Sequence, residues 1–534
     1  MDQIFPFSNL PLELQLDVFE CMDRATLHST FQVNKRWHDL SARILWSYPS
    51  AQRMATLAVI QPPERRQYYA SKIHVVHIKE PKRCSAYSSL AFSSLRYLGL
   101  CGNTCEPGSR VSIQAGPYLQ AKLQAISFHH CIMPQNILSQ IKSHCGFITR
   151  IELHHAVREF DDDVFAEFPQ SLPCLRDLTL GNESTTATID SLCRITADTL
   201  APRLEILCLP YPTGSVEPEG FRKFMANCKS LKHFCLYNTK ESRHQGLLSG
   251  KLLAHVLHVN PLTCLDVDFL TPELIEQTLL YTSAPFAKLQ RLRLKTDSTT
   301  MISALRHTST NLRTLHLFPS DITAGFFTSI SRQTNLHALA ILLPAFQIIT
   351  NANFLALSSL KTLRLLAIVS QVPVWRPAQM PNLDDSTFRR WIANFPRLQR
   401  LEIRCECPEL TVMAIQALAD ACPLLETCTL MYTHNLSVLN ALGASLPLLP
   451  KLTNLQVHDV DDSMGVRLAG EYANMLMRMA PKLDRFGVES DSEWAVALVE
   501  ALHEERPYKP LGEGDVAGMP PLRTEMGALP FSYS

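Results

Sequence analysis

Residues able to do chemistry are scattered along this 534-residue chain, and few stand in a catalytic pattern. The histidine pairs His129-His130 and His154-His155 could offer nitrogen ligands to a metal ion. No carboxylate or cysteine framework accompanies them in the sequence, so surface histidines are the favoured interpretation. Cys405 and Cys407 form a C-x-C pair with no second pair at zinc-site spacing, which favours buried cysteines at the end of a strand.

Signatures of catalysis are missing from the rest of the sequence. It contains no G-x-G-x-x-G after a strand, no Walker lysine motif, no H-E-x-x-H and no G-x-S-x-G. The run GEGDVAG at 512–518 resembles a phosphate loop only in composition and lies in a tail rich in proline and glycine. We therefore predict a protein that is not an enzyme and needs no cofactor and no metal.

The charge balance bears on the partners. Lys+Arg and Asp+Glu both number 50, and this neutrality argues against nucleic acid or an anionic membrane as a partner. The start MDQIFPFSNL lacks the basic and apolar regions of a signal peptide. The most apolar run, LHALAILLPAF at 336–346, has about half the length needed to span a bilayer. We expect an intracellular protein, cytoplasmic or nuclear.

A six-residue pattern, apolar-x-x-apolar-x-apolar, organises most of the chain. It occurs sixteen times between Ile73 and Val488, for example as LRDLTL at 175 and LQRLRL at 289, with a mean spacing of about 27 residues. Its final alternation is typical of a strand with one buried face, and helical stretches lie between the copies. The motif and spacing resemble leucine-rich repeats. The resemblance implies an α/β solenoid with parallel strands on the concave face and helices on the convex face.

The outward positions of these strands supply the candidate residues for binding a target. The fourth and sixth motif positions point into the core, and the third, fifth and seventh point outward. With LKTLRL at 360 counted as one copy, the charged outward residues are Asp266, Asp268, Arg291, Arg293, Lys295, His316, Arg364, Arg400 and Arg404. They could bind a charged or phosphorylated segment, or they could form a solvated face of ion pairs, which we favour.

The longest interval between copies, 360–398, adds two candidates. It contains QVPVWRPAQMPN, in which Trp375 and Arg376 lie among three prolines. Long loops in repeat arrays are often functional, and Trp and Arg are frequent interface anchors. Packing of Trp375 against the neighbouring repeat is an equally good interpretation.

Residues 9–46 do not follow the repeat. The sequence predicts three short helices there, opened by Pro11, Asp23 and Asn34, with Trp37 on the apolar face of the third. So small a unit cannot use all its apolar surface internally, which indicates a partner. A cap that packs on the first repeat is the alternative.

This N-terminal region resembles an F-box. The matching positions are Leu10-Pro11-x-Glu13, Val18-Phe19, Met22-Asp23, Leu27, Val33, Lys35-Arg36-Trp37 and Leu45-Trp46. The resemblance implies a substrate receptor of an SCF-type ubiquitin ligase, whose F-box docks on a Skp-type adaptor linked to a cullin and a RING subunit. The repeats would hold an unknown target protein for ubiquitination. Carried over by position, the adaptor contacts fall on Leu10, Pro11, Leu14, Val18, Phe19, Leu27, Val33 and Trp37.

Four segments follow from these patterns. We expect an F-box at 5–46, linker or capping helices at 47–72, a solenoid of about 16 degenerate repeats at 73–503 and a flexible tail at 504–534. Two functions remain open at this point. The chain is either the substrate-recognition subunit of an SCF-type ligase, or a leucine-rich-repeat scaffold or binding protein that acts outside the ligase.

Overall fold

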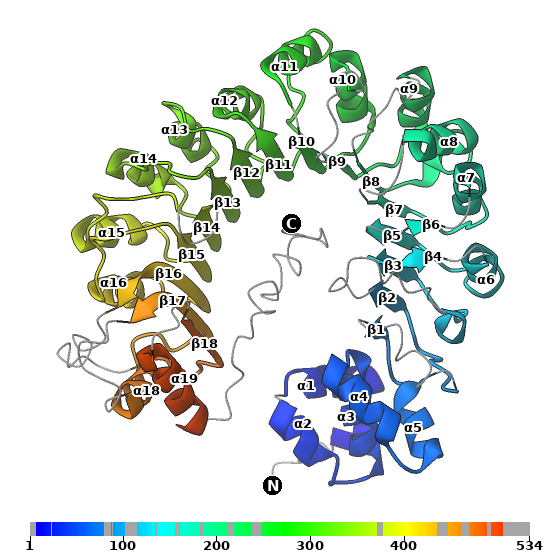
Figure 1. The fold of residues 1–534 in the computed structure, drawn as a ribbon, viewed down its shortest axis with the longest axis horizontal. Helices are drawn as coiled ribbons and strands as arrows, with labels where there is room; N and C mark the ends of the chain where they lie inside the picture. The colour runs from blue at the N-terminus through cyan, green and yellow to red at the C-terminus, as the bar shows by residue number, and fades with distance from the viewer. Residues whose placement is uncertain are drawn as a thin grey trace. The chain divides into compact units, whose positions relative to one another are not determined.

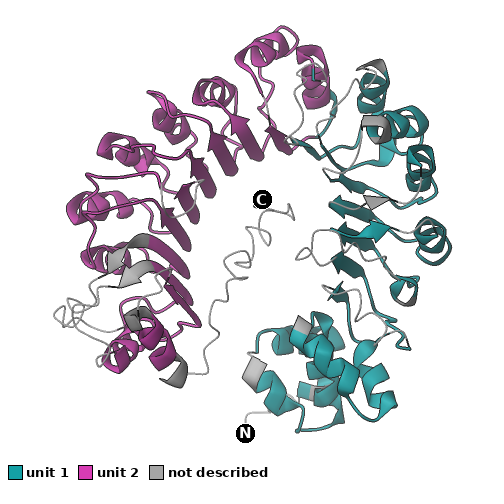
Figure 2. Cartoon of the chain, viewed as in Figure 1, with its two compact units in different colours: residues 1–248, 259–261 teal, residues 249–258, 262–534 magenta. Residues whose placement is uncertain are grey.

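The structure is a computed structural model, and it describes most of the chain. The described residues are 7–22, 24–78, 87, 89–101, 115–133, 136–154, 157–158, 161–181, 186–210, 218–237, 248–268, 270–370, 377–434, 447–460, 469–488 and 493–505. They fall into two compact units, unit 1 with residues 1–248 and 259–261, and unit 2 with residues 249–258 and 262–534 (Figure 2). Within the described ranges, no helix is both long enough and apolar enough to cross a bilayer.

Unit 1 begins with a group of short helices (Figure 1). They are η1 (Phe7–Asn9), α1 (Leu12–Glu20), α2 (Arg24–Thr30), α3 (Lys35–Ser47), α4 (Ala51–Val59) and α5 (Pro63–Ala70). The predicted three helices of residues 9–46 are confirmed as α1, α2 and α3. Asn34 caps α3 as predicted, because its side chain accepts a hydrogen bond from the backbone N–H of Trp37 at 2.9 Å.

The rest of unit 1 alternates strands with helices. Its strands lie parallel and in chain order: β1 (Val75–Ile78), β2 (Tyr97–Cys101), β3 (Ala125–His129), β5 (Arg150–His154), β7 (Asp177–Leu180), β8 (Ile206–Pro210) and β9 (His233–Tyr237). A separate pair is formed by β4 (Ile132–Met133) and β6 (Val157–Arg158). The connecting helices are η3 (Gly116–Tyr118), α6 (Ile137–His144), α7 (Asp162–Gln170), α8 (Thr186–Thr196), η4 (Ala201–Arg203) and α9 (Pro218–Asn227).

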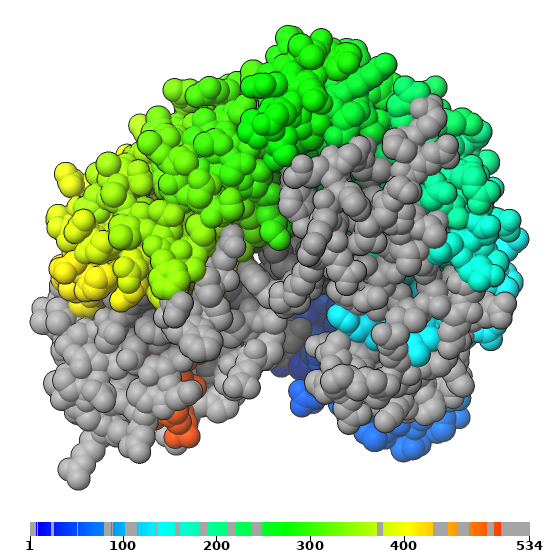
Figure 3. All heavy atoms as spheres, turned by 45° about the horizontal axis from the view of Figure 1, so that its top comes forward, coloured from blue at the N-terminus to red at the C-terminus, as the bar shows by residue number. Residues whose placement is uncertain are grey.

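Unit 2 repeats the same arrangement. Its parallel strands are β10 (Cys264–Asp268), β11 (Arg291–Thr296), β12 (Thr314–Pro319), β13 (Ala338–Leu343), β14 (Leu365–Ser370), β15 (Arg400–Arg404), β16 (Thr427–His434), β17 (Asn454–Val460) and β18 (Arg485–Val488). Its helices are α10 (Gly250–Val259), α11 (Pro272–Leu279), α12 (Ser298–Arg306), α13 (Phe326–Ser331), α14 (Asn351–Ala356), η5 (Leu357–Ser359), α15 (Asp385–Ile392), α16 (Met413–Ala421), α18 (Ala469–Met479) and α19 (Glu493–Glu505). In the space-filling view, side chains of unit 2 form a continuous outer surface coloured from green to yellow (Figure 3).

Fifteen of the sixteen predicted copies of the six-residue pattern coincide with one of these parallel strands, and the copy at 360 overlaps only the first residue of β14, so the leucine-rich-repeat architecture is confirmed. In each unit the helices lie on one side of the strands (Figure 1). The core fills the layer between them: in the copy at 289, for example, Leu289, Leu292 and Leu294 are buried while the side chain of Lys295 is exposed. One strand and one helix alone cannot bury such a face, so each repeat is stabilised by its neighbours.

The copy placed at 360 lies in a different register from the one predicted. Strand β14 pairs Leu365 with Ala338 and with Arg400, so the motif begins at Leu363. The run LKTLRLLAI contains two overlapping matches to the pattern, and the structure adopts the one in which Leu363, Leu366 and Ile368 are all buried. The match that begins at Leu363 places three large apolar side chains in the core, away from water.

Candidate functional site

The N-terminal helices pack around a small aromatic and aliphatic core. Phe19, Leu27, Leu40 and Leu45 form its buried centre. Trp37 packs edge-on against this centre, with its ring centroid 5.4 Å from that of Phe19 and 5.6 Å from that of Phe7. Trp37 is therefore a half-buried part of the helical core.

Apolar side chains remain on the outside of the same helices. Leu12, Leu14 and Val18 on α1 are 41%, 49% and 42% exposed, and Val33 in the turn before α3 is 55% exposed. Leu14 and Val18 are one helical turn apart, so they lie on one face of α1. We call these four residues the apolar docking patch. A domain of this size that exposes several aliphatic side chains is typical of a protein-binding module.

The following helices join this group to the first strands of unit 1. Asp39 on α3 accepts hydrogen bonds from Lys72 Nζ at 2.6 Å and Tyr68 Oη at 2.7 Å, which ties α3 to α5 and the residues after it. Burial alone would raise the pKa of Asp39, but these hydrogen bonds and the charge of Lys72 hold that pKa below its usual range. Tyr87 Oη donates to the backbone oxygen of Met54 at 2.8 Å. The role of residues 47–72 as linker or capping helices stays a prediction.

The outward face of β10 and β11 carries a charged cluster in place of an open basic stripe. Arg293 Nη1 donates to Asp266 Oδ1 at 2.5 Å and to Asp268 Oδ1 at 3.3 Å, and both carboxylates are buried. The guanidinium also lies over the ring of Phe318, 4.5 Å from its centroid. Arg293, Asp266 and Asp268 thus form an ion-paired cluster whose carboxylates are buried, whereas the favoured expectation was a solvated face.

The other predicted outward residues differ in their ion pairs and in their exposure. Arg400 and Arg404 both pair with Glu402, at 3.2 and 2.7 Å, and Arg404 Nη2 donates to Gln456 Oε1 at 3.0 Å. His316 is buried beside Arg293, whereas Arg291 is half-buried and Lys295 is exposed.

The remaining predicted target-binding residues are Arg364, Trp375 and Arg376. Arg364 does not lie on the outward face of a strand, since the register of β14 places it in the turn before the strand, where its backbone oxygen accepts from Gln399 N–H at 2.8 Å. Trp375 and Arg376 lie outside the described residues.

The cysteine pair after β15 is buried, as predicted. Cys405 and Cys407 have exposed fractions of 0% and 2%. Burial raises the pKa of the Cys407 thiol to about 12 and that of Cys405 well above its usual value, so both remain protonated thiols at neutral pH.

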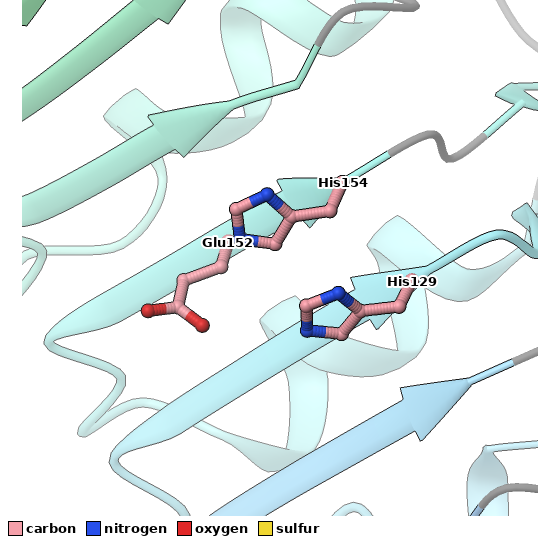
Figure 4. A group of neighbouring side chains, drawn as sticks. All are labelled: His129, Glu152 and His154. Carbon is pink, nitrogen blue, oxygen red and sulfur yellow. The ribbon is translucent and has the colours of Figure 1, made fainter. Parts of the chain in front are cut away.

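Two of the predicted histidines meet a carboxylate on the outward face of unit 1. The rings of His129 on β3 and His154 on β5 stack with centroids 4.5 Å apart, and Glu152 lies on the same face of β5 (Figure 4). One potential ligand atom from each of the three residues lies within 4.8 Å of the others. Sequence reasoning missed Glu152, and its place two residues before His154 on one strand face is the signal that could have identified it. Its proximity to His129 follows only from the pairing of β3 with β5.

A protein-family model now decides the nature of the N-terminal helices. Residues 7–52 match the model of the F-box-like domain. The chain carries an F-box-like domain. This match spans η1 to the start of α4 and includes all of the apolar docking patch.

Comparisons of the whole chain find similarity at low identity. No curated protein sequence matches the chain. Among solved structures, an internalin from Listeria monocytogenes is 13% identical, with a TM-score of 0.31 and coverage of 84% of this chain and 97% of that chain. Rad7 in the complex of Rad7 and Elc1 from yeast is 14% identical, with a TM-score of 0.38 and coverage of 91% and 96%. TLR13 in its complex with ssRNA13 is 15% identical, with a TM-score of 0.40 and coverage of 80% and 64%.

The F-box-like domain divides the eight predicted adaptor-contact residues into surface and core. Pro11, Leu14, Val18 and Val33 are exposed, and Leu10 and Trp37 are half-buried. Phe19 and Leu27 are only 0% and 3% exposed, so in this structure they support the helices and have almost no surface to offer a partner. Leu12 was not among the predicted residues, and its place between Pro11 and Leu14 at the start of an apolar helix is the signal that could have identified it.

Proposed function

We propose that this chain is a substrate receptor of an SCF-type ubiquitin ligase. Its F-box-like domain docks on a Skp-type adaptor, and through the adaptor on a cullin and its RING subunit. The repeats hold a target protein on the outward faces of their strands. The observation that carries the proposal is the apolar docking patch, which lies on the surface of a domain that matches the F-box-like model.

The proposed receptor contributes proximity and no chemistry of its own. Holding a target beside the ubiquitin-transferring subunits makes transfer effectively intramolecular, which can lower its barrier by several kcal/mol, roughly 7–11 at the upper limit. Such a receptor needs no catalytic residue. We place it in the cytoplasm or the nucleus, where ubiquitin ligases of this class act.

The ion-paired arginines make it less favourable for a target to bind through a phosphate group. Arg293, Arg400 and Arg404 already engage carboxylates, so a phosphorylated target would have to displace Asp or Glu side chains of the chain itself. We therefore propose that recognition uses the strand face as a whole, with Lys295 as an exposed cation in unit 2. This second part of the proposal is independent of adaptor docking.

The adaptor proposal is tested by placing charges in the apolar docking patch. We expect the double variant Leu14→Asp, Val18→Asp to weaken binding of the full chain to a purified Skp-type adaptor at least about tenfold, because both side chains would carry unpaired charge into an apolar interface. Binding would be measured by calorimetry. Both positions are exposed, so the helices should keep their circular dichroism spectrum and melting temperature.

A matched control lies on α4. Val59 is 73% exposed and outside the apolar docking patch, so Val59→Asp should leave adaptor affinity unchanged. If the native chain does not bind the adaptor, or if the double variant binds as well as the native chain, the receptor proposal fails. The chain would then be a leucine-rich-repeat scaffold or binding protein that acts outside the ligase.

A further inference from the structure

The outward face of unit 1 brings together three side chains of the kind that bind transition metals. In the parallel pairing of β3 with β5, His129 is the register partner of His154 and Ser127 is the register partner of Glu152. All three candidate ligands therefore project from one face of two adjacent strands (Figure 4). His129 and His154 are half-buried, so an ion can reach them from solvent, whereas Glu152 is buried.

The distances are close to those of a metal-bound arrangement. Ligand atoms on a tetrahedral Zn²⁺ lie about 3.3–3.5 Å from one another, given bonds of about 2.0–2.2 Å. Here the three candidate atoms lie within 4.8 Å of one another. The side chains must rotate to bind one ion, because the two stacked rings are nearly parallel, with an interplanar angle of 16°, and direct their nitrogen lone pairs along similar lines.

The surroundings of the three residues are those of an outer coordination shell. Arg150 Nε lies 3.2 Å from Glu152 Oε1 and 2.5 Å from Asp177 Oδ2. Asp177 therefore neutralises the guanidinium of Arg150, and the negative charge of Glu152 remains to attract a cation. Ser127 Oγ lies 2.6 Å from His129 Nε2 and orients the ring. A metal at Nδ1 of His129 would keep this contact, and a metal at Nε2 would replace it.

Cys101 on β2 does not complete the group. Cys101 is the register partner of His129, and thiolate is a strong zinc ligand, so its sulfur would complete four-fold coordination if it lay close enough. The side chains that lie within 4.8 Å of one another are His129, Glu152 and His154 only, among the residues that the structure describes. Three protein ligands leave one position of a tetrahedral ion open.

We propose that His129, Glu152 and His154 bind a divalent transition-metal ion of the Zn²⁺ class on the outward strand face of unit 1. Two imidazoles and one carboxylate suit Zn²⁺ better than Mg²⁺ or Ca²⁺, which prefer oxygen ligands alone. The open position takes water in the free protein. When a partner lies on this strand face, a histidine, a carboxylate or a cysteine of that partner replaces the water and is bound directly. The site does not depend on the proposed ligase role.

The test is a zinc titration of the full chain against a chromophoric chelator of known affinity. The chain has 19 histidines and 16 cysteines, so weak background binding is expected and stoichiometry is the decisive quantity. We expect the triple variant His129→Ala, Glu152→Gln, His154→Ala to bind one ion fewer per chain than the native protein. Each single variant should raise the Kd of that ion at least about tenfold.

Two controls separate ligand loss from other effects. Cys101→Ser should leave the affinity and stoichiometry unchanged, and Co²⁺ in place of zinc should show the visible bands of a four-coordinate ion without a thiolate charge-transfer band. The triple variant should also keep the circular dichroism spectrum of the native protein, so that loss of the ion reflects loss of the ligands. Equal stoichiometry in the native and triple-variant proteins would overturn the proposal, as would loss of the ion in Cys101→Ser.

Discussion

At the scale of single residues, the outward strand face of unit 2 is organised by ionisable groups that are buried. Asp266 and Asp268 share the guanidinium of Arg293, and His316 lies on the next strand opposite Arg293. Removing one partner from such a group leaves an uncompensated buried charge, which costs about 3–5 kcal/mol. These buried charges therefore hold β10, β11 and β12 in a defined arrangement, and they are not free to bind a charged target.

His316 predicts a dependence of stability on pH. Burial, reinforced by the charges of Arg293 and Arg291, lowers its pKa from 6.5 to about 3. The unfolded chain therefore binds a proton between pH 6.5 and 3 that the folded chain does not bind, so stability is lost as pH falls below 6.5. We expect His316 to account for about 2 kcal/mol of lost stability between pH 7.5 and pH 5.

The measurement is denaturant unfolding at several pH values. His316→Leu should flatten the dependence over this range, because leucine has no proton to gain. His258 on α10 is exposed, so His258→Gln should leave the dependence as it is in the native protein. An unchanged slope in His316→Leu would show that other groups govern acid sensitivity.

At the scale of elements, two adjacent repeats approach so closely at Gly250 that a larger residue there must displace them. Gly250 is the first residue of α10 and packs against α11. A Cβ built on Gly250 would lie 2.7 Å from the backbone carbonyl carbon of Gln277 and 2.8 Å from the backbone nitrogen of Thr278. Because backbone atoms cannot rotate away as a flexible side chain can, the two helices must separate to admit a methyl group.

Two glycines in helices should therefore respond in opposite ways to alanine. Gly250→Ala should lower stability by about 1–3 kcal/mol through overpacking. Gly470 in α18 has no atom within 4 Å of an added Cβ, so Gly470→Ala should be neutral or raise stability by about 0.5–1 kcal/mol. Shifts of the denaturation midpoint measure both effects. Stabilisation by Gly250→Ala would contradict the close approach of α10 and α11.

At the scale of the whole molecule, stability is built from contacts between neighbouring repeats. Trp391 on α15 illustrates this: its ring is buried, with centroids 3.8 Å from Phe354 of the preceding repeat, 5.7 Å from Phe388 and 4.9 Å from Phe395. Damage to one such cluster should weaken the repeats that meet there and leave distant ones intact.

Trp391→Ala should therefore loosen the chain locally. We expect a loss of about 3–5 kcal/mol at this cluster, because a large cavity replaces the indole. Hydrogen exchange should become faster in α14, α15 and α16 while α1–α3 keep native protection. Phe346 is 61% exposed, so Phe346→Ala is the matched control that should change neither region. Uniform loss of protection along the chain would show a single cooperative unit.

Much of this architecture could be predicted from the sequence because its determinants are local and periodic. The motif at 289 specifies a strand with one buried face, and Asn34 specifies the start of α3, through residues within a few positions of one another. The same holds for the F-box-like domain, whose positions lie within about 40 consecutive residues. The alternation of strand and helix followed without knowledge of any long-range contact.

The tertiary structure alone decided which side chains meet. The overlapping motifs at 360 and 363 are equivalent in local pattern, and only the pairing of β14 with its neighbours selects the second and moves Arg364 off the strand face. Phe19 and Val18 are adjacent apolar residues, yet packing buries one and exposes the other. His129 and Glu152 are separated by 22 intervening residues and become neighbours because parallel strands align their registers. Periodicity fixes which face a residue occupies within its own repeat, but side chains from different repeats are brought together only by the register between strands, which every repeat settles with its neighbours.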